Sequence, residues 1–337
     1  MKRYGNLFEK IALFKNLYNA SKKAFKGRKK YSPQGSSFFF NLENELIRLE
    51  DDLLSGQYKP GPYYHFTIYD PKFRQICAAN FRDRVLHHGI CNVIEPIFEK
   101  IFIHDSYACR KGKGTHTAIK RAQFYARKFD YFIKCDIRKY FETIDHQVLI
   151  SILNKKFKDK KLLDLLSTII QNPYPGGIFG KGVPIGNLTS QLFANLYLDQ
   201  LDHIVKEQHG IKGYVRYMDD FLLFDNNKAK LHDYLSKIRN FINNTLLLEI
   251  KENEIVLAPV TQGIEFLGFR IFRKTIRMQR NKLVRFRRKI RKREKQYIDG
   301  EISEDELINS VRSMIAHISH YNTFKMRQSF FHGIENI

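Results

Sequence analysis

Two adjacent acids, Asp219 and Asp220, interrupt the apolar stretch GYVRYMDDFLLF. The runs on either side are short and rich in residues that favour strands, so the stretch predicts a β-hairpin with the two acids at its bend. Like charges side by side raise each other's pKa unless a cation lies nearby. The two acids must therefore lie either in a solvated surface turn or beside a bound cation. The sequence of the hairpin leaves both interpretations open.

A third aspartate stands in a similar apolar setting. Asp136 lies between Cys135 and Ile137, in a run that predicts a strand over residues 131–137. Aspartate is a poor strand former and a buried unpaired carboxylate is costly, so either a salt bridge to an arginine or a metal ion must compensate it. On adjacent strands, these carboxylates could hold two Mg²⁺ ions about 4 Å apart, an arrangement that catalyses phosphoryl transfer. Spacing in the sequence does not establish that the strands are neighbours.

The charge of the chain points to a polyanionic partner. Its 337 residues include 58 Lys+Arg and 35 Asp+Glu, a formal net charge of +23, which favours nucleic acid. A basic structural binder would carry the same charge. However, 43% hydrophobic and 14% aromatic residues indicate a large buried core rather than a solvated tail. The length predicts two or three lobes.

The cysteines and the lack of long apolar segments indicate the cellular compartment. Cys77, Cys91, Cys109 and Cys135 occur singly, without the close pairs of zinc or redox centres, and we expect reduced core thiols. The sequence contains no apolar run of about 18 residues and no apolar leader at its start, which argues against membrane insertion and secretion. We expect a cytoplasmic protein with no membrane partner.

The remaining pattern predicts a mixture of helices and strands. Helical periodicity or capping residues predict helices over residues 37–54 and 81–99, from Asp145, and from Asn187, the last amphipathic and capped by Asn187. A hairpin is predicted around residues 70–72.

Two basic segments stand out. Residues 107–116 (YACRKGKGTH) combine glycines with cations, which lets backbone and charge approach phosphates together. After residue 271 we expect a basic helix with Leu283, Ile290 and Tyr297 along one face and arginines and lysines outside.

Taken in order, these motifs resemble the reverse transcriptases. Tyr217-Met218-Asp219-Asp220 resembles their signature of a tyrosine, any residue and two aspartates. KFRQI, FIKCDIRKYFETIDH, VPIGNLTSQLFANLYLDQLDH and EFLGFRI resemble the fingers motif, the two further palm motifs and the primer grip. The resemblance implies an α+β right-hand polymerase fold with an antiparallel palm sheet: residues 1–125 mainly fingers, 126–270 palm (147–180 partly returning to the fingers) and 271–337 a basic helical thumb.

The resemblance also implies roles for individual residues. Asp136, Asp219 and Asp220 would be the catalytic carboxylates and, with Ile137, would bind two Mg²⁺ ions, for which Mn²⁺ could substitute. The nucleotide would contact Lys72, Arg74, Tyr140, Phe141, Ile185, Gly186 and Gln191, with Phe141 as the gate that excludes a 2′-hydroxyl. Nucleic acid would contact Arg110, Lys111, Lys113, Tyr217, Met218, Leu267, Gly268, Arg285, Arg288 and Lys292. Core packing for Phe141 and Ile185, a solvated hairpin for Lys72 and Arg74, and a plain turn for Gly186 remain open. In the fourth motif Asn253 and Glu254 replace the usual late lysine, with Lys251 slightly earlier.

A departure from the usual sequence in the motif VPIGNLTSQLFANLYLDQLDH makes the resemblance more specific. Ile185-Gly186 followed by Ser190-Gln191 replaces the usual Gln-Gly and Ser-Pro, and this resembles the reverse transcriptases of diversity-generating retroelements. Those enzymes copy a template-repeat RNA with errors opposite adenines. At residue 185 an isoleucine offers only shape where a glutamine could hydrogen-bond, which reduces discrimination.

The implied setting is a bacterial or phage-encoded enzyme. Its implied partners are a structured template RNA, an RNA/DNA hybrid and primer, dNTPs and a small basic accessory oligomer, the accessory variability protein. Two alternatives stay open: a phage-defence or other bacterial reverse transcriptase that diversifies no gene, and a non-catalytic RNA-binding, maturase-like protein.

Overall fold

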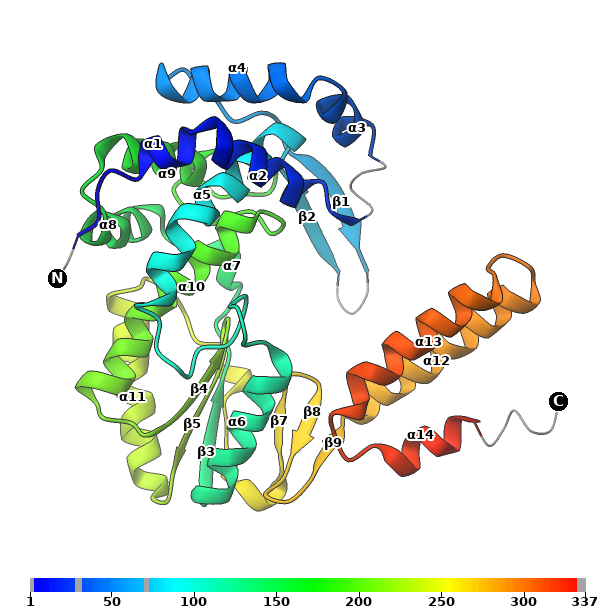
Figure 1. The fold of residues 1–337 in the computed structure, drawn as a ribbon. Helices are drawn as coiled ribbons and strands as arrows, with labels where there is room; N and C mark the ends of the chain where they lie inside the picture. The colour runs from blue at the N-terminus through cyan, green and yellow to red at the C-terminus, as the bar shows by residue number, and fades with distance from the viewer. Residues whose placement is uncertain (1–2, 28–31, 70–72, 332–337) are drawn as a thin grey trace.

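The computed structural model describes residues 3–27, 32–69 and 73–331. Helices gather above a central sheet, and a pair of long helices near the C-terminus projects to one side of the molecule, next to a smaller sheet (Figure 1). Within the described residues, the strands form a two-stranded, a four-stranded and a three-stranded sheet, and all of the pairings are antiparallel. None of the helices in these residues combines the length and the apolar character needed to cross a membrane.

The upper lobe is helical. Its helices are α1 (Phe8–Ala12), α2 (Phe14–Ala24), α3 (Pro33–Phe40), α4 (Leu42–Leu54), α5 (Phe81–Glu99), α8 (His146–Lys156) and α9 (Lys160–Gln171). The helix predicted over residues 81–99 is confirmed as α5, and the Asp145 side chain caps α8 as predicted. The helix predicted over residues 37–54 is instead two helices that meet at Asn41. The break allows Phe38 to pack against Phe81 while Leu46 is buried in α4.

A hairpin of β1 (Tyr64–Ile68) and β2 (Arg74–Ala78) projects from this lobe, which confirms the predicted hairpin. The predicted turn Asp70-Pro71-Lys72 lies outside the described residues. β1 is exposed along its whole length, whereas Cys77 in β2 is buried and donates its backbone N–H to the Ile185 carbonyl (3.0 Å).

The central sheet has the order β4-β5-β3-β6. Its strands are β3 (Tyr131–Cys135), β4 (Gly213–Tyr217), β5 (Asp220–Asp225) and β6 (Val256–Pro259). The hairpin predicted at GYVRYMDDFLLF is confirmed as β4 and β5. The strand predicted over residues 131–137 ends at Cys135, so Asp136 lies just beyond it; the chain leaves β6 there, and Ile137 bridges to Ile250.

Alternate residues of the sheet face different cores, as the pleat of a strand requires. Ile133 and Leu223 belong to the large core that includes α10 (Leu188–His203) and α11 (Lys228–Asn244). Phe132 and Leu222 belong to a second core. That second core includes α6 (Thr115–Lys128) and the sheet of β7 (Ile264–Phe266), β8 (Phe269–Ile271) and β9 (Ile276–Met278).

The helix predicted from Asn187 is confirmed as α10, but its predicted amphipathic character and side-chain cap are wrong. α10 is buried on nearly every face, because it runs through the middle of the large core (Figure 1). Asn187 makes no side-chain cap; its Oδ1 accepts a hydrogen bond from the Ala79 N–H (3.3 Å) and its Nδ2 donates to the Tyr63 hydroxyl (3.2 Å). The residue therefore joins α10 to the upper lobe.

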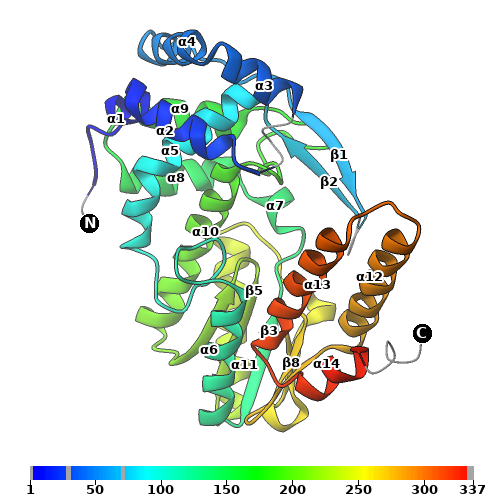
Figure 2. The ribbon, with the colours of Figure 1, turned by 45° about the vertical axis from the view of Figure 1, so that its right-hand side comes forward.

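The C-terminal lobe consists of α12 (Arg280–Ile298), α13 (Glu304–Ser319) and α14 (Phe324–Phe331). α12 and α13 lie side by side, on the same side of the molecule as the β1–β2 hairpin (Figures 1 and 2). The predicted apolar face of α12 is only partly correct: Ile290 is buried with Phe286, but Tyr297 is 43% exposed. The three-stranded sheet next to these helices continues past residue 271, where the thumb was predicted to begin, because β9 pairs with β8.

Candidate active site

The strand register brings the three predicted carboxylates to one end of the central sheet. Cys135 lies opposite Phe221, so the next residue, Asp136, faces the position of Asp220 at the start of β5. Tyr217 pairs with Asp220 across the hairpin, and Met218 and Asp219 form its two-residue turn. The charges of Asp136 and Asp219 both raise the pKa of Asp220, as expected for neighbouring acids.

Asp220 is half-buried at the start of β5. Burial raises the pKa of its carboxyl to about 7, and the Lys134 ammonium, 3.9 Å from Oδ1, opposes that rise. Oδ1 is buried and accepts no hydrogen bond from the described residues. Lys134 lies two residues before Asp136 and so projects from the same face of the strand.

Two further charged residues adjoin the carboxylates. The Lys251 N–H donates to the Asp136 carbonyl (2.8 Å), and the Lys251 ammonium pairs with Glu254. Glu254 raises the pKa of Lys251, with smaller contributions from Asp136 and Asp220. Sequence reasoning missed Lys134, although its alternation with Asp136 was a usable signal. The proximity of Lys251 becomes visible only in the bridge between Ile137 and Ile250.

A divalent cation suits the donor chemistry of this site. Carboxylate oxygens are the ligands that Mg²⁺ prefers, and Asp220 Oδ1 is a buried acceptor without a hydrogen bond. Among the residues that the structure describes, no three His, Cys, Asp or Glu side chains are spaced to enclose an ion as they stand. Asp136, Asp219 and Asp220 would therefore have to turn toward a shared ion. The Ile137 side chain is buried and has no donor atom, so only the backbone of this residue could serve as a ligand.

The predicted nucleotide contacts in the first palm motif differ in exposure. Tyr140 is buried and donates its hydroxyl to the Ala194 carbonyl (2.5 Å), so it is part of the core. Phe141, in α7 (Tyr140–Thr143), is half-buried, with its ring centroid 5.7 Å from that of Tyr140. Arg74 is the first residue of β2, whereas Lys72 lies outside the described residues.

The loop before α10 is attached to the hairpin of the upper lobe. The Ile185 carbonyl accepts the Cys77 N–H, and the Ile185 side chain is half-buried. Gly186 has a φ of +137°, and a Cβ added there would lie 2.6 Å from the Cys77 carbonyl oxygen. The space left by Gly186 is thus needed by β2, a contact with a distant segment that the sequence did not predict. Gln191 is half-buried in the first turn of α10.

Two predicted phosphate-binding cations are engaged within their own loop. The Arg110 guanidinium pairs with Glu99 (3.0 Å) and donates to the carbonyls of Ile103 (2.6 Å) and Ser106 (2.9 Å). Lys113 Nζ donates to the His104 carbonyl (2.9 Å). These two cations thus donate to carbonyls of their own loop. Charge and glycine content alone do not predict this role. Lys111 and Cys109 are exposed, so Cys109 is not the core thiol that the sequence predicted.

Other predicted nucleic-acid contacts lie near one another. Leu267, Gly268 and Arg285 line one open cavity of about 440 Å³ between the three-stranded sheet and the helices of the C-terminal lobe. Arg288 and Lys292 are exposed on α12. In the hairpin, the Tyr217 hydroxyl accepts a hydrogen bond from Thr115 (3.1 Å), and Met218 packs against the large core.

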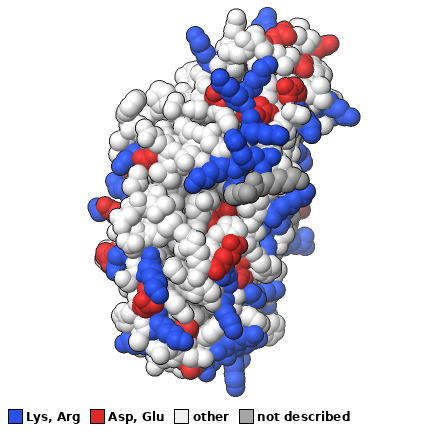
Figure 3. Space-filling model, turned by 90° about the vertical axis from the view of Figure 1, so that its left-hand side faces the viewer, with Lys and Arg blue, Asp and Glu red and all other residues white. Residues whose placement is uncertain are grey.

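Positive charge is not confined to this side of the molecule. Figure 3 shows the face on the left-hand side of Figure 1, away from α12, and Lys and Arg are spread over it with Asp and Glu interspersed. The net charge of +23 is therefore a property of much of the surface and attracts polyanions over a wide area.

Comparisons with known proteins agree with this geometry. Residues 59–271 match the family described as reverse transcriptase (RNA-dependent DNA polymerase). Protein YkfC of Escherichia coli strain K12 is 27% identical over 282 residues, which cover 70% of this chain and 73% of YkfC. Group II intron-encoded protein LtrA of Lactococcus lactis subsp. cremoris is 24% identical over 349 residues, 83% of this chain but only 57% of LtrA.

A solved structure of apo telomerase from Candida tropicalis resembles this chain in fold, with a TM-score of 0.50 and 12% identity over 66% of this chain and 49% of the telomerase. The predicted right-hand polymerase fold is thereby confirmed. The family match spans more than half of the chain and contains Asp136 and the hairpin of Asp219 and Asp220. This chain belongs to the reverse transcriptase family, the RNA-dependent DNA polymerases.

Proposed function

We propose that this chain synthesises cDNA on an RNA template, with Asp136, Asp219 and Asp220 as the catalytic carboxylates. The observation that carries the proposal is the β3–β5 register, which sets Asp136 beside the acidic turn. Two Mg²⁺ ions, or Mn²⁺ in their place, would activate the primer 3′-hydroxyl and neutralise the leaving pyrophosphate when bound there. The chain's own residues position the reacting groups and supply charge, which is most of what phosphoryl transfer requires.

The lobes take the corresponding roles in this proposal. The upper helices and the β1–β2 hairpin act as fingers, the central sheet as palm, and α12 and α13 as thumb. Phe141, half-buried beside the carboxylates' strand, limits the space for a 2′-hydroxyl. Lys72 and Arg74 contact the triphosphate. The primer and template run past Tyr217, Met218 and the cavity of Leu267, Gly268 and Arg285, with Arg288 and Lys292 on the duplex backbone.

We further propose that the enzyme belongs to the diversifying branch and miscopies template adenines. The support is Ile185: its backbone is tied to β2, so an apolar side chain is held at a position where a glutamine would offer hydrogen bonds. A structured template-repeat RNA and a small basic accessory oligomer are the partners of this proposal.

A maturase-like, RNA-binding role is the second candidate, and the match to LtrA along 83% of this chain favours it. The acidic cluster speaks against binding alone. A surface that only holds phosphates gains nothing from Asp220, whose burial raises its pKa to about 7, beside two more acids.

Primer extension tests the polymerase. The native chain, a DNA primer annealed to a defined RNA, dNTPs and Mg²⁺ should give full-length cDNA, and Asp219→Asn should reduce the rate by about a hundredfold or more, since several kcal/mol of charge stabilisation is lost. Asp233→Asn is the matched control, because Asp233 is an exposed aspartate on α11 that pairs only with Lys237 among the described residues. Extension that survives Asp219→Asn contradicts the mechanism.

Sequencing the cDNA separates the branches. Errors concentrated opposite template adenines, with the accessory protein supplied, support diversification, and accurate cDNA leaves a polymerase of the phage-defence kind. RNA binding without extension by the native chain leaves the maturase-like role.

A further inference from the structure

The catalytic turn itself has an unusual backbone. Met218 is the first residue of the two-residue turn between β4 and β5, and its φ is +56°. Turns of this kind usually have glycine at that position, because a side chain there strains the backbone by about 1–3 kcal/mol. Such a conformation persists only when surrounding contacts hold it in place. Asp219, a proposed catalytic carboxylate, is the next residue.

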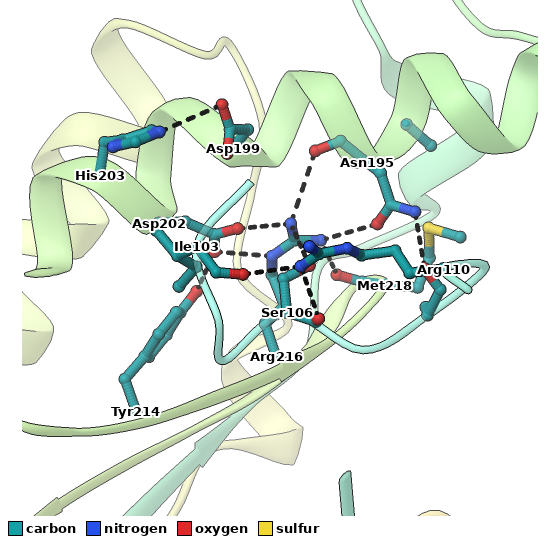
Figure 4. A network of polar contacts seen from close by, with 12 residues as sticks. Ile103, Ser106, Arg110, Asn195, Asp199, Asp202, His203, Tyr214, Arg216 and Met218 are labelled. Carbon is teal, nitrogen blue, oxygen red and sulfur yellow. Dashed lines mark hydrogen bonds and ion pairs between the residues drawn. The ribbon is translucent and has the colours of Figure 1, made fainter. Parts of the chain in front are cut away.

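The contact that holds this turn comes from Arg216, whose side chain is fully buried. Its Nη1 donates to the Met218 carbonyl (3.0 Å) and to Asn195 Oδ1 (3.3 Å). Its Nε and Nη2 bind the two oxygens of Asp202, at 2.7 and 2.5 Å, and Nη2 also donates to Ser106 Oγ (3.1 Å). All five N–H groups of the guanidinium are therefore used (Figure 4).

These partners come from two other segments of the fold. Asn195 and Asp202 lie on α10, the helix that the large core encloses, and Ser106 lies on the loop that Arg110 organises (Figure 4). Main-chain bonds reinforce the second attachment: the Arg216 N–H donates to the Asp105 carbonyl (2.9 Å), and the Tyr107 N–H donates to the Arg216 carbonyl (3.0 Å). The guanidinium thus connects the turn to a helix and a loop that cannot shift independently of the core.

Stability alone is a poor explanation for this arrangement. Taking an arginine and an aspartate out of water costs several kcal/mol per ion, and apolar residues of similar volume often replace a buried pair without loss of stability. Burial would lower the pKa of Arg216, but Asp202 raises it, so the guanidinium stays charged. A planar fork that reaches a helix, a loop and a turn at once supplies orientation that an apolar core cannot.

We infer that Arg216 is the positioning residue of the catalytic turn: with Asp202, Asn195 and Ser106 it fixes the Met218 carbonyl and thereby the direction in which Asp219 presents its carboxylate. The inference rests on the proposed polymerase activity for its catalytic consequence, but the placement of Asp219 can be measured without it.

The test compares two buried changes on the same elements. In Arg216→Met/Asp202→Leu the charged pair is removed as a unit, so no lone charge is left in the core. Tyr197→Phe is the matched control: Tyr197 is equally buried on α10 and donates to the Leu246 carbonyl (2.6 Å), but it does not touch the guanidinium. The thermal midpoint, the affinity for Mn²⁺ followed by electron paramagnetic resonance on the free chain, and kcat and KM for one dNTP addition are measured for each.

We expect the double variant to fold with a lowered thermal midpoint, because Ser106, Asn195 and the Met218 carbonyl lose a hydrogen-bond partner. It should bind Mn²⁺ about 10-fold to 100-fold more weakly than the native chain and lose kcat by a similar factor, with KM for dNTP little changed. Tyr197→Phe should lower the thermal midpoint and leave Mn²⁺ affinity and kcat within twofold. Native Mn²⁺ affinity and kcat in a folded double variant would overturn the inference.

Arg216→Lys serves if the double variant does not fold. A lysine keeps the charge for Asp202 but cannot reach Asp202, Ser106 and the Met218 carbonyl together. The same loss of Mn²⁺ affinity is expected, and native affinity overturns the inference. A native chain that binds Mn²⁺ through Asp219 but extends no primer refutes the proposed function, while the Mn²⁺ comparison still decides the role of Arg216. A native chain without Asp219-dependent Mn²⁺ binding refutes both.

Discussion

Replacing Gly186 by alanine should detach the loop before α10 from the β1–β2 hairpin. Four glycines of this loop have positive φ, among them Gly180 at +73° and Gly186 at +137°. At Gly180 no described atom lies within 4 Å of an added Cβ, so Gly180→Ala introduces only the left-handed backbone, about 1–2 kcal/mol. Gly180 is therefore the matched control.

The cost at Gly186 is larger, because its Cβ would lie 2.6 Å from the Cys77 carbonyl oxygen and 3.2 Å from Ile76 Cγ2. The backbone itself contributes about 1–3 kcal/mol and the overpacking about 1–3 kcal/mol more. We expect Gly186→Ala to be less stable than Gly180→Ala by about 2 kcal/mol, which lowers the thermal midpoint by roughly a further 4 °C.

Hydrogen exchange locates the effect. The Cys77 N–H is bound to the Ile185 carbonyl, so its exchange should accelerate in Gly186→Ala and not in Gly180→Ala. Equal thermal midpoints for the two variants, together with unchanged protection of the Cys77 amide, would refute the claim that Gly186 is needed for the close approach to β2.

Three further predictions concern other parts of the chain. Phe141→Val should raise ribonucleotide insertion by about tenfold or more relative to dNTP insertion, because space opens under the sugar; single-nucleotide extension with each substrate checks this. The pair with Asp199 (3.4 Å) raises the pKa of His203 to about 9, so its stabilisation is present below pH 6.5 and lost as the pH rises through 9. Thermal midpoints across that window should fall, and His203→Gln should flatten the fall. Burial would raise the pKa of Asp105, but Arg121 lowers it to about 2, so about 2 kcal/mol of stability is present above pH 3.8 and lost as the pH falls through 2. Asp105→Asn should remove this acid dependence from denaturant titrations between pH 4 and pH 2.

The sequence predicts local features of this fold well. The alternation of β-formers around Asp219 and Asp220 is enough for the hairpin, and the periodicity of residues 81–99 is enough for α5. Both are consequences of neighbours in the chain. The right-hand polymerase fold is predicted from the order of the motifs, because motifs in this order resemble those of reverse transcriptases.

Features that depend on contacts formed only in the folded chain are missed or wrongly assigned from the sequence alone. Arg110 looked like a phosphate ligand because its neighbours are cations and glycines, but the carbonyls of Ile103 and Ser106 occupy it. Asn187 looked like a helix cap, but Tyr63 and Ala79 lie within its reach. Arg216 drew no attention, since only the fold brings Asp202 and Ser106 to it. The partners of Asn187, and Ser106 as a partner of Arg216, are distant along the chain. The carbonyls that bind Arg110 lie only a few residues away, but in a loop whose conformation the sequence pattern does not predict.

The burial of α10 on nearly every face restricts which substitutions this chain can accept. A helix with a solvent-facing stripe accepts change along that stripe, but here nearly every position is a neighbour of something fixed. Substitutions are thus expected to accumulate along the exposed strand β1 and at the exposed positions of α12, such as Arg288 and Lys292, where fewer packed neighbours constrain the side chain. The buried residues at the centre of the molecule would change slowly, while the exposed residues around them change more freely.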